Sequence, residues 1–348
     1  MAYQVGIVGG SGYTGAELLR LLAGHSDLDV VVATAESNAG QPVATLFPSL
    51  RGAYPELVFS AYDEDDLAGL DLVFVGLPHG ESQRVIPGLA ATVAHIVDLG
   101  ADFRLPAASY EQWYGVGHSA PALLDSFAYG LPELLRDEII ESSHVAAPGC
   151  YPTASILALA PLVAAGVIES TGVVVNACSG VSGAGRSPKV ASLFAEADAS
   201  VSAYGLLAHR HTAEIEMVLT ELQAAKRAPV QVLFTPHLVP MVRGIHATCT
   251  ARPAASGLST AALLAHYRDF YAAEPFVLVV DEPPATKAAT TSNAAHVTVR
   301  FDERTNTVLA IGVIDNLTKG ASGQALQCAN LLLGLVESQG LSAVGMWP

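Results

Sequence analysis

The feature that most constrains the fold is a glycine-rich segment near the start of the chain, Gly10-Ser11-Gly12-Tyr13-Thr14-Gly15, which has the spacing G-x-G-x-x-G. It follows an apolar run, Val5 to Val8, and precedes a helical pattern, Glu17 to Leu22. Glycines at this spacing allow a tight turn, so that the backbone and the helix N-terminus can bind a pyrophosphate. The motif therefore predicts a strand–loop–helix unit that binds a dinucleotide.

The first half of the chain alternates strand-like apolar runs with helical patterns. Such alternation is typical of a parallel sheet with helices on both faces. It continues to about Ala147, so we expect a Rossmann-type domain over residues 1–149. Beyond the first strand, the expected strands are Leu28 to Ala33, Leu72 to Val75 and His95 to Leu99.

The second half contains more strand-like runs than helical ones. This excess favours an α+β domain with a mostly antiparallel sheet, which we place at residues 150–315. The expected strands are Val173 to Ala177, Val230 to Thr235, Ile245 to Ala251, Val277 to Val280, Val297 to Phe301 and Val308 to Val313. The expected helices are Thr212 to Ala225, Leu263 to Ala272 and Ala321 to Leu335.

Composition limits the classes of partner. The chain is 51% hydrophobic and 14% charged, as expected for a folded protein and not for a disordered one. Its formal net charge of −16 argues against nucleic acid or an anionic membrane as the main partner, because both require a basic surface. The N-terminus has no basic stretch, and no apolar run is long enough to span a membrane, so we expect a cytoplasmic protein.

Cys150 is the strongest candidate nucleophile. It follows a strand-like run and precedes a helical one, and Pro152 suits the first turn of that helix. A thiol at a helix N-terminus has a lowered pKa, which increases the share of reactive thiolate at neutral pH. The remaining cysteines lie within apolar segments and form no C-x-x-C pair, so we expect small buried side chains and no metal or disulfide at Cys178, Cys249 and Cys328.

A nucleophilic thiol needs a base, and the sequence His209-Arg210-His211 offers two imidazoles at the start of an expected helix. In a strand or turn the two imidazoles would point the same way and Arg210 the other way. We expect one of the two histidines to act as general acid and base, and the pattern leaves open which one. His79, which follows the strand 72–75, is a further candidate to line the cofactor crevice.

Few cations are available to bind an anionic ligand. Candidates in polar, glycine-rich contexts are Arg104, Arg186 with Lys189, and Lys319. The segment Ser179 to Arg186 combines exposed backbone N–H groups with a bidentate donor, which predicts a carboxylate or phosphate site. At the end of the second strand, Glu36 favours NAD and Ser37 favours NADP, so the spacing alone does not choose the cofactor.

Seven segments, in order over essentially the whole chain, resemble the N-acetyl-gamma-glutamyl-phosphate reductase family of the semialdehyde dehydrogenases. They are Gly9 to Gly15, Gly100 to Leu105, Pro148 to Thr153, Ser179 to Arg186, His209 to Ile215, Phe234 to His237 and Asp315 to Gly320. The resemblance implies NADPH-dependent reduction of N-acetyl-glutamyl 5-phosphate to N-acetyl-glutamate 5-semialdehyde and phosphate, in arginine biosynthesis. The substrate would be a small anionic acyl phosphate.

The resemblance also implies roles for individual residues. Cys150 matches the family nucleophile, and His209, with His211 second, best matches the acid–base histidine. The matched cofactor positions are Gly10, Ser11, Gly12, Tyr13, Thr14, Gly15, Ser37, Pro78, Ser182, Gly183, Asn316 and Lys319. The matched substrate positions are Arg104, Arg186, Ser179 and Gly180, and the family implies no metal.

In the implied mechanism the Cys150 thiolate attacks the acyl phosphate, phosphate leaves, and hydride from NADPH reduces the thioester. His209 would pair with the thiolate and supply the proton, and N–H groups near Cys150 would stabilise the oxyanion. The resemblance further implies that residues 316–348 complete the NADP-binding domain. The sheet of the second domain would carry the interface of a homodimer or homotetramer.

Three other functions remain possible from the residues. The nearest is a sister enzyme, either an aspartate-semialdehyde dehydrogenase or a reductase of a carrier-linked amino-acid phosphate. A nucleotide-sensing regulatory protein would not need a reactive Cys150. A cysteine hydrolase would not need the glycine loop.

Overall fold

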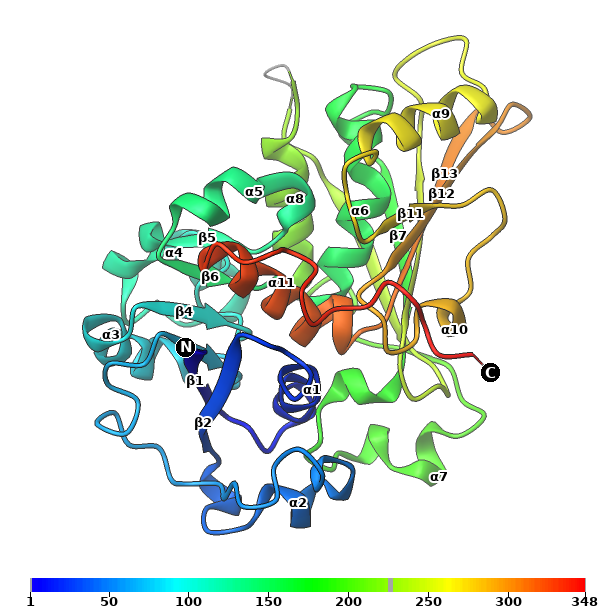
Figure 1. The fold of residues 1–348 in the computed structure, drawn as a ribbon. Coiled ribbons are helices and arrows are strands. Elements are labelled where there is room, and N and C mark those ends of the chain that lie inside the picture. Colours follow the sequence, from blue (N-terminus) through cyan, green and yellow to red (C-terminus); the bar gives the residue numbers. More distant parts are fainter. Residues whose placement is uncertain (1, 225–227, 348) are drawn as a thin grey trace. The chain divides into compact units, whose positions relative to one another are not determined.

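The computed structural model describes residues 2–224 and 228–347, and contacts divide the chain into two compact units (Figure 1). The first unit comprises residues 2–148 and 321–341. The second comprises residues 149–320 and 342–347. Each unit is therefore built from two separate stretches of the sequence.

The first unit contains a six-stranded sheet in which every pair of neighbouring strands is parallel. The strand order is β2-β1-β3-β4-β6-β5, so the order reverses between β1 and β3. Ligands of such sheets bind at the carboxyl ends of the strands beside this reversal. The Rossmann-type sheet predicted from the sequence is confirmed. Its strands are β1 (Tyr3–Val8), β2 (Leu28–Thr34), β3 (Leu72–Val75), β4 (His95–Asp98), β5 (Phe127–Tyr129) and β6 (His144–Ala146).

Hydrophobic clusters cover both faces of this sheet. Along β3, Leu72 and Phe74 belong to one cluster, whereas Val73 and Val75 belong to the other. Successive side chains of a strand point to opposite faces, so an unbroken apolar run is what a strand buried on both sides requires. This is why the apolar runs of the first half predicted the strands well.

The helices of the first unit include one from the end of the chain. This helix, α11, packs against α5, β4 and α1. It begins at Gly323, after a π-helical turn at Thr318–Ser322, and ends at Leu332, so it is shorter than the expected helix Ala321 to Leu335. The helices are α1 (Tyr13–Leu22), α2 (Val43–Leu46), α3 (Ser82–Thr92), α4 (Ala107–Tyr114), α5 (Pro132–Glu141) and α11 (Gly323–Leu332).

The second unit contains a seven-stranded mixed sheet in the order β11-β12-β13-β10-β7-β9-β8. Four of its six strand pairs are antiparallel, and the pairs β7–β9 and β11–β12 are parallel. The predicted mostly antiparallel sheet is confirmed. The strands are β7 (Val173–Ser179), β8 (Ser202–Ala203), β9 (Val232–Leu238), β10 (Ile245–Ala251), β11 (Val277–Val279), β12 (Ala295–Asp302) and β13 (Thr307–Ile314).

One buried helix organises the second unit. Helix α6 packs against β10, β12 and β13, and also against α8 and α9. A Cβ on Gly312 of β13 would lie 2.3 Å from the carbonyl oxygen of Ala154, so helix and sheet are in direct backbone contact. No described helix is long and apolar enough to cross a membrane. The helices are α6 (Cys150–Ala164), α7 (Phe194–Ala197), α8 (His211–Glu221), α9 (Thr260–Phe270) and α10 (Thr286–Ala289).

Several predicted boundaries move by a few residues. Helix α1 begins at Tyr13, not at Glu17, because the glycine loop leads directly into its first turn. Strand β9 begins at Val232, not at Val230, because the N–H of Val230 donates to the Thr220 hydroxyl, 2.9 Å away, instead of joining the sheet. The expected helix Thr212 to Ala225 is α8, and its last expected residue lies outside the described residues.

Candidate active site

The loop after β1 leaves space where a side chain would clash. Gly9 has a φ of +83°, and a Cβ there would lie 2.5 Å from the carbonyl oxygen of Gly76, which follows β3. A Cβ on Gly15 would lie 2.4 Å from the carbonyl oxygen of Gly10. No side chain caps α1, whose N-cap is Gly12. An uncapped helix end behind a bare backbone loop fits the phosphates of a dinucleotide.

The residues after β2 form the edge that would face the ribose of such a ligand. Glu36, Ser37 and Asn38 form a short 3-10 turn. The Glu36 carboxylate accepts a hydrogen bond of 3.3 Å from the N–H of Tyr62, and the Ser37 hydroxyl accepts one of 3.1 Å from the Asn38 amide. The acidic group is thus engaged with the protein's own backbone.

A buried carboxylate fixes the loop that contains Pro78, directly after β3. The two oxygens of Asp102 lie 2.8 and 2.9 Å from the N–H of Gly80. Asp102 also accepts hydrogen bonds from the N–H of Gln83 at 3.1 Å and the Tyr110 hydroxyl at 2.8 Å. The Pro78 loop and the start of α3 are therefore held by one fully buried side chain.

Arg104 is held at the end of β4. Its Nη2 donates to the carbonyl oxygen of Leu99 at 2.9 Å. Nearby Asp98 is completely buried, and this burial raises the pKa of its carboxyl to about 7. Hydrogen bonds from Gly100 and Ser82, and the charge of Arg104, oppose that shift without cancelling it.

Cys150 is the first residue of α6, as the sequence predicted for a thiol at a helix start. The preceding residue, Gly149, donates its N–H to the Glu214 carboxylate at 3.0 Å. A Cβ on Gly149 would lie only 2.5 Å from Nε2 of His211. A Cβ on Gly320 would lie 2.8 Å from the Cβ of Cys150. The His211 imidazole thus packs against Gly149, directly before the half-buried Cys150, and Gly320 packs against the cysteine itself.

The two candidate histidines lie together. Their ring centroids are 4.8 Å apart, and each ring contacts Tyr151, the residue after the cysteine, at 5.7 and 5.9 Å. Burial, with a smaller contribution from the charge of Arg210, lowers the pKa of His209 to about 4. Nε2 of His211 lies 3.9 Å from Oε1 of Glu214. His209 is therefore held neutral, whereas His211 has a carboxylate beside it.

Two phenols extend this cluster. The Tyr204 hydroxyl donates to the Tyr151 hydroxyl at 2.9 Å, and Tyr151 donates to the carbonyl oxygen of His237 at 3.3 Å. Burial is the main cause that raises the pKa of Tyr151 well above its usual value, and the charges of Tyr204 and Cys150 add to it. Both phenols therefore stay protonated beside the thiol.

The glycine-rich turn after β7 meets the segment that follows β13. The Ser179 hydroxyl donates to the carbonyl oxygen of Gly180 at 3.0 Å, and a Cβ on Gly183 would lie 2.7 Å from the Ser179 oxygen. The Asn316 amide donates to the Ser182 hydroxyl at 3.0 Å. The turn is thus a compact backbone surface joined to Asn316.

The two cations beyond this turn differ in exposure. Arg186 is exposed at the end of the turn. Lys319 is fully buried, with its Nζ 5.8 Å from the centre of the Phe276 ring.

Sequence reasoning gave no role to Glu214, Arg243 or Asp315, although all three have contacts at the site. Glu214 lies three residues after His211, and this spacing brings two side chains together on a helix, so the signal was present. Arg243 and Asp315 are 72 residues apart, and no sequence pattern predicts such a pair.

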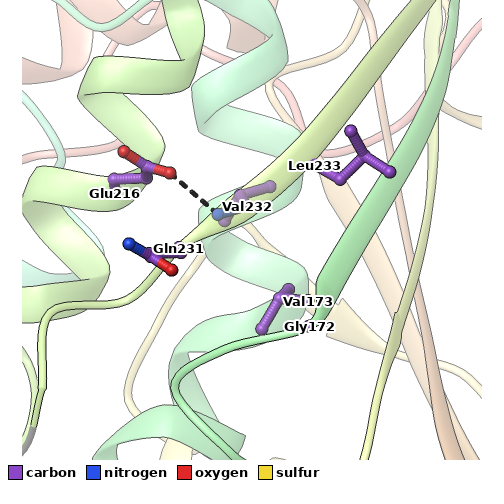
Figure 2. A pocket seen from close by; sticks show the side chains of 6 residues that line it. All are labelled: Gly172, Val173, Glu216, Gln231, Val232 and Leu233. Atoms are coloured by element: carbon purple, nitrogen blue, oxygen red, sulfur yellow. Dashed lines mark hydrogen bonds between the residues drawn. The ribbon is translucent and has the colours of Figure 1, made fainter. Parts of the chain in front are cut away.

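The described residues contain no group of three or more His, Cys, Asp or Glu side chains arranged to hold a metal ion. A pocket of about 350 Å³ lies at one end of β7 and β9 (Figure 2). Its lining includes Glu216, whose carboxylate accepts a hydrogen bond from the N–H of Val232 at 2.8 Å. Neither Cys150 nor the two histidines line it, so this pocket is separate from the thiol.

Two family profiles match the chain. The family described as "Semialdehyde dehydrogenase, NAD binding domain" matches residues 4–142, and "Semialdehyde dehydrogenase, dimerisation domain" matches residues 150–316. Curated relatives named "N-acetyl-gamma-glutamyl-phosphate reductase" include those of Symbiobacterium thermophilum, at 48% identity, and Pseudomonas aeruginosa, at 46%. Each alignment covers 99% of this chain and 99% of the relative.

Solved structures share the fold at low sequence identity. Aspartate semialdehyde dehydrogenase II of Vibrio cholerae, described as complexed with ASA, has a TM-score of 0.73 at 17% identity and covers 96% of this chain. Aspartate semialdehyde dehydrogenase of Candida albicans, described with NADP, has a TM-score of 0.69 at 13% identity, also over 96% of this chain. In both cases 99% of the solved chain is covered.

Proposed function

Since the chain belongs to the N-acetyl-gamma-glutamyl-phosphate reductase family of the semialdehyde dehydrogenases, we propose that it reduces N-acetyl-glutamyl 5-phosphate to N-acetyl-glutamate 5-semialdehyde and phosphate. The product would serve arginine biosynthesis. The observation that carries the proposal is the placement of Cys150 at an uncapped helix start, with His211 and Glu214 packed around Gly149.

In the first step, Cys150 acts as the nucleophile. The positive end of the α6 helix dipole favours the thiolate, which is the attacking form. A bond forms between Sγ and the acyl carbon, and the bond from that carbon to the phosphate oxygen breaks. The thiol proton passes to His211 and leaves with the phosphate, and Cys150 is left as a thioester.

In the second step, the thioester carbon becomes an aldehyde. When bound, a reduced nicotinamide would supply the hydride for this carbon. N–H groups at the start of α6 and the imidazole of His211 then stabilise the oxyanion. The carbon–oxygen double bond re-forms, the carbon–sulfur bond breaks, and the Cys150 thiolate is restored.

The two histidines receive different roles in this proposal. A general acid and base must exchange a proton near neutral pH, and His209, with its pKa lowered to about 4 by burial, does so poorly. His211 has the Glu214 carboxylate 3.9 Å away to stabilise its charged form. We therefore assign the proton transfers to His211 and assign to His209 the orientation of its neighbours, since its Nδ1 accepts the N–H of His211 at 3.3 Å.

The proposed cofactor is NADP. It would bind through Gly10, Ser11, Gly12, Tyr13, Thr14, Gly15, Ser37, Pro78, Ser182, Gly183, Asn316 and Lys319. The hydrogen bond that Glu36 accepts from the N–H of Tyr62 supports this proposal, because the carboxylate has a partner other than the ribose. The anionic groups of the substrate would bind at Arg104, Arg186, Ser179 and Gly180.

We propose that cofactor binding and catalysis are assigned to different parts of the chain. Residues 1–149, completed by the C-terminal segment from about 316 to 348, would bind NADP. Residues 150–315 would hold the catalytic groups and the interface of a homodimer or homotetramer. Alternate side chains of β10, including His246 and Thr248, are only half-buried in the single chain, and a partner subunit would cover them. The four cysteines, all within the described residues, form no disulfide, which is usual in the reducing cytoplasm.

The test measures the phosphate-dependent reduction of NADP⁺ with N-acetyl-glutamate 5-semialdehyde. The absorbance of the reduced cofactor reports the rate. NAD⁺ and aspartate semialdehyde are run in parallel. We expect rapid turnover with the acetylated aldehyde and NADP⁺, and little with the other pairs. Turnover with aspartate semialdehyde alone would support the proposed reaction chemistry but contradict the proposed substrate. Turnover with NAD⁺ alone would overturn the cofactor.

A Cys150→Ser variant tests the thioester step, because a hydroxyl is a far weaker nucleophile than a thiolate at neutral pH. We expect turnover to fall below detection. A Cys178→Ser variant is the matched control, since Cys178 is half-buried near the end of β7 and burial raises the pKa of its thiol. Near-native turnover of Cys150→Ser would remove the basis of the mechanism.

A further inference from the structure

We propose that Arg243 and Asp315 are positioning residues for this reaction: their ion pair, in which the carboxylate is fully buried, holds the segment 315–320 against Cys150 and against the turn that contains Ser182. The inference goes beyond the assignments above, because neither side chain is placed on the substrate or the cofactor. It rests on the proposed function only for its turnover measurement.

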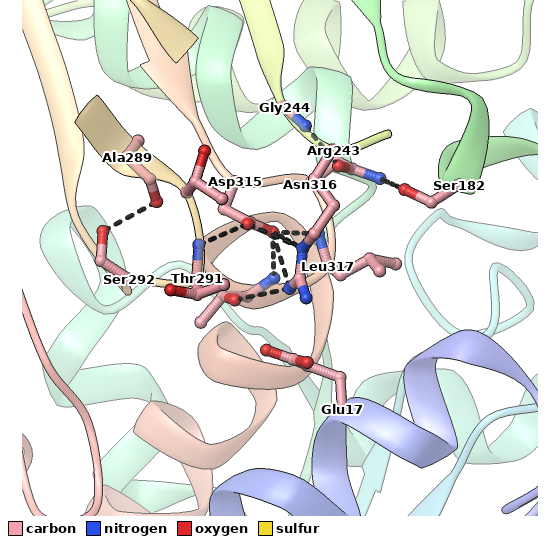
Figure 3. A network of polar contacts seen from close by, with 12 residues as sticks. Glu17, Ser182, Arg243, Gly244, Ala289, Thr291, Ser292, Asp315, Asn316 and Leu317 are labelled. Atoms are coloured by element: carbon pink, nitrogen blue, oxygen red, sulfur yellow. Dashed lines mark hydrogen bonds and ion pairs between the residues drawn. The ribbon is translucent and has the colours of Figure 1, made fainter. Parts of the chain in front are cut away.

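Asp315 is the centre of a converging set of donors (Figure 3). Its carboxylate is fully buried and lies 2.9 Å from Nε of Arg243. It also accepts the N–H groups of Thr291 at 2.7 Å, Leu317 at 2.8 Å and Thr318 at 3.0 Å. One side chain thereby closes its own turn and ties that turn to two other segments.

Arg243 binds the same turn at a second point. Its Nη2 donates to Oδ1 of Asp315 and to the Thr318 hydroxyl, both at 3.0 Å. A planar guanidinium can hold two acceptors in fixed directions, which an ammonium cannot. The pair therefore sets the orientation of the 315–318 turn as well as its distance from residue 243.

Asn316, which lies in this turn, connects the turn to Ser182 by hydrogen bonds. The N–H of Gly244 donates to Oδ1 of Asn316 at 2.6 Å, so the other end of the amide must be the donor. That donor, Nδ2, bonds the Ser182 hydroxyl at 3.0 Å. The N–H of Ser182 in turn donates to the carbonyl oxygen of Val242 at 3.1 Å. The segments 180–182, 242–244 and 315–318 are thus joined in a closed set of hydrogen bonds.

The same turn ends at the nucleophile. The N–H of Gly320 donates to the carbonyl oxygen of Asp315 at 2.9 Å. Gly320 lies so close to Cys150 that an added Cβ would be 2.8 Å from the Cβ of the cysteine and 3.2 Å from its Cα. A shift of the 315–320 segment would therefore open one side of Cys150. Displacements of about 1 Å at a reacting centre can lower a rate on the order of 100-fold.

The experiment compares Arg243→Lys with the unchanged enzyme. Lysine keeps a positive charge beside Asp315, so the buried carboxylate is not left unpaired and the chain can fold. We expect kcat to fall about 10- to 100-fold, a larger change than in the KM for the aldehyde, because the pair holds the segment beside Cys150, where the reaction takes place. We also expect iodoacetamide, without cofactor or substrate, to alkylate Cys150 at least about threefold faster.

Cys249 reports whether the variant has loosened as a whole. It is fully buried on β10 in the same unit, and mass spectrometry can follow its alkylation separately from that of Cys150. Arg268→Lys is the matched control, because Nη2 of Arg268 lies 2.7 Å from both carboxylate oxygens of Asp281 on the surface. We expect this control to retain the native kcat and both native alkylation rates.

Three outcomes would overturn the inference: native kcat in Arg243→Lys, a lowered kcat with unchanged Cys150 alkylation, or equal acceleration at Cys150 and Cys249. The third outcome would indicate a purely structural ion pair. Alkylation needs no substrate or cofactor, so it tests the pair even if the unchanged enzyme fails to reduce the acetylated acyl phosphate. Failure of the proposed function and failure of this inference are therefore distinguishable.

Discussion

The carboxylate of Glu214 accepts the N–H of Gly149 at 3.0 Å, and its other oxygen lies 3.9 Å from the imidazole of His211. One buried side chain thus fixes both the residue before the proposed nucleophile and the proposed base. Because Glu214 and His211 share helix α8, the base keeps a constant position relative to the start of α6. This arrangement explains why Gly149 has no room for a side chain.

Replacement of Gly149 by alanine should displace His211 without straining the backbone. Gly149 has φ −68° and ψ 152°, which alanine adopts freely, but its Cβ would lie 2.5 Å from Nε2 of His211. We expect Gly149→Ala to lower kcat on the order of 100-fold and to cost about 1–3 kcal/mol of stability. Steady-state kinetics and urea unfolding measure both. Gly52→Ala, with nothing near its Cβ, should leave both values unchanged.

Substitution of each histidine by glutamine should separate their roles. We expect His211→Gln to lower kcat about 100- to 10,000-fold, the usual contribution of a general acid and base. His209→Gln should lower it less, because a neutral His209 serves only to orient its neighbours. The pH dependence of kcat/KM provides the second measurement. The reverse order of the two losses would transfer the proton-transfer role to His209.

The stability of the protein should fall at acidic pH partly because of His209. Its pKa is about 4 in the folded state and 6.5 when exposed, so between these values the unfolded state binds more protons. Stability contributed by the neutral imidazole is present above pH 6.5 and is lost as the pH falls toward 4, by up to about 1.4 kcal/mol per pH unit. Unfolding free energies from pH 4 to 7 should show a shallower acid limb in His209→Gln.

Asp98 should have the opposite effect. Burial raises its folded pKa to about 7 from 3.8, so between these values the folded state binds more protons and stability falls as the pH rises. Asp98→Asn keeps an acceptor for Ser82 and Gly100 but cannot ionise. Relative to the unchanged protein, we expect it to gain about 2–3 kcal/mol between pH 5 and pH 8. If the urea midpoints of both proteins changed equally with pH, this prediction would be contradicted.

Local sequence patterns predicted the fold because they reflect local physics. The family resemblance, the parallel sheet and the mostly antiparallel sheet are confirmed, and the limits of Leu72–Val75 and Ile245–Ala251 agree at both ends. Buried strands produce unbroken apolar runs, and the glycine spacing marks a turn that only glycine fits. The helix start at Cys150 was also predicted correctly, because it too depends on neighbouring residues in the sequence.

The sequence did not predict contacts between residues that are far apart along the chain. Glu214 meets Gly149 across 65 positions, and Arg243 meets Asp315 across 72. Tyr62 engages Glu36 from 26 positions away, so the sequence alone left the direction of that acidic side chain open. The roles of the site residues stay predictions until the variants described above are measured.

The origin of α11 has a consequence for how the protein is made. This helix packs against α1 and β4, yet more than half of the chain separates it from them in the sequence. A ribosome releases residues in order, so the nucleotide-binding sheet is synthesised early and must wait, with one flank uncovered, until nearly all of the chain has emerged. A separately expressed nucleotide-binding unit would therefore need residues 2–148 joined to 321–341, and a simple truncation after Pro148 would expose apolar surface and aggregate.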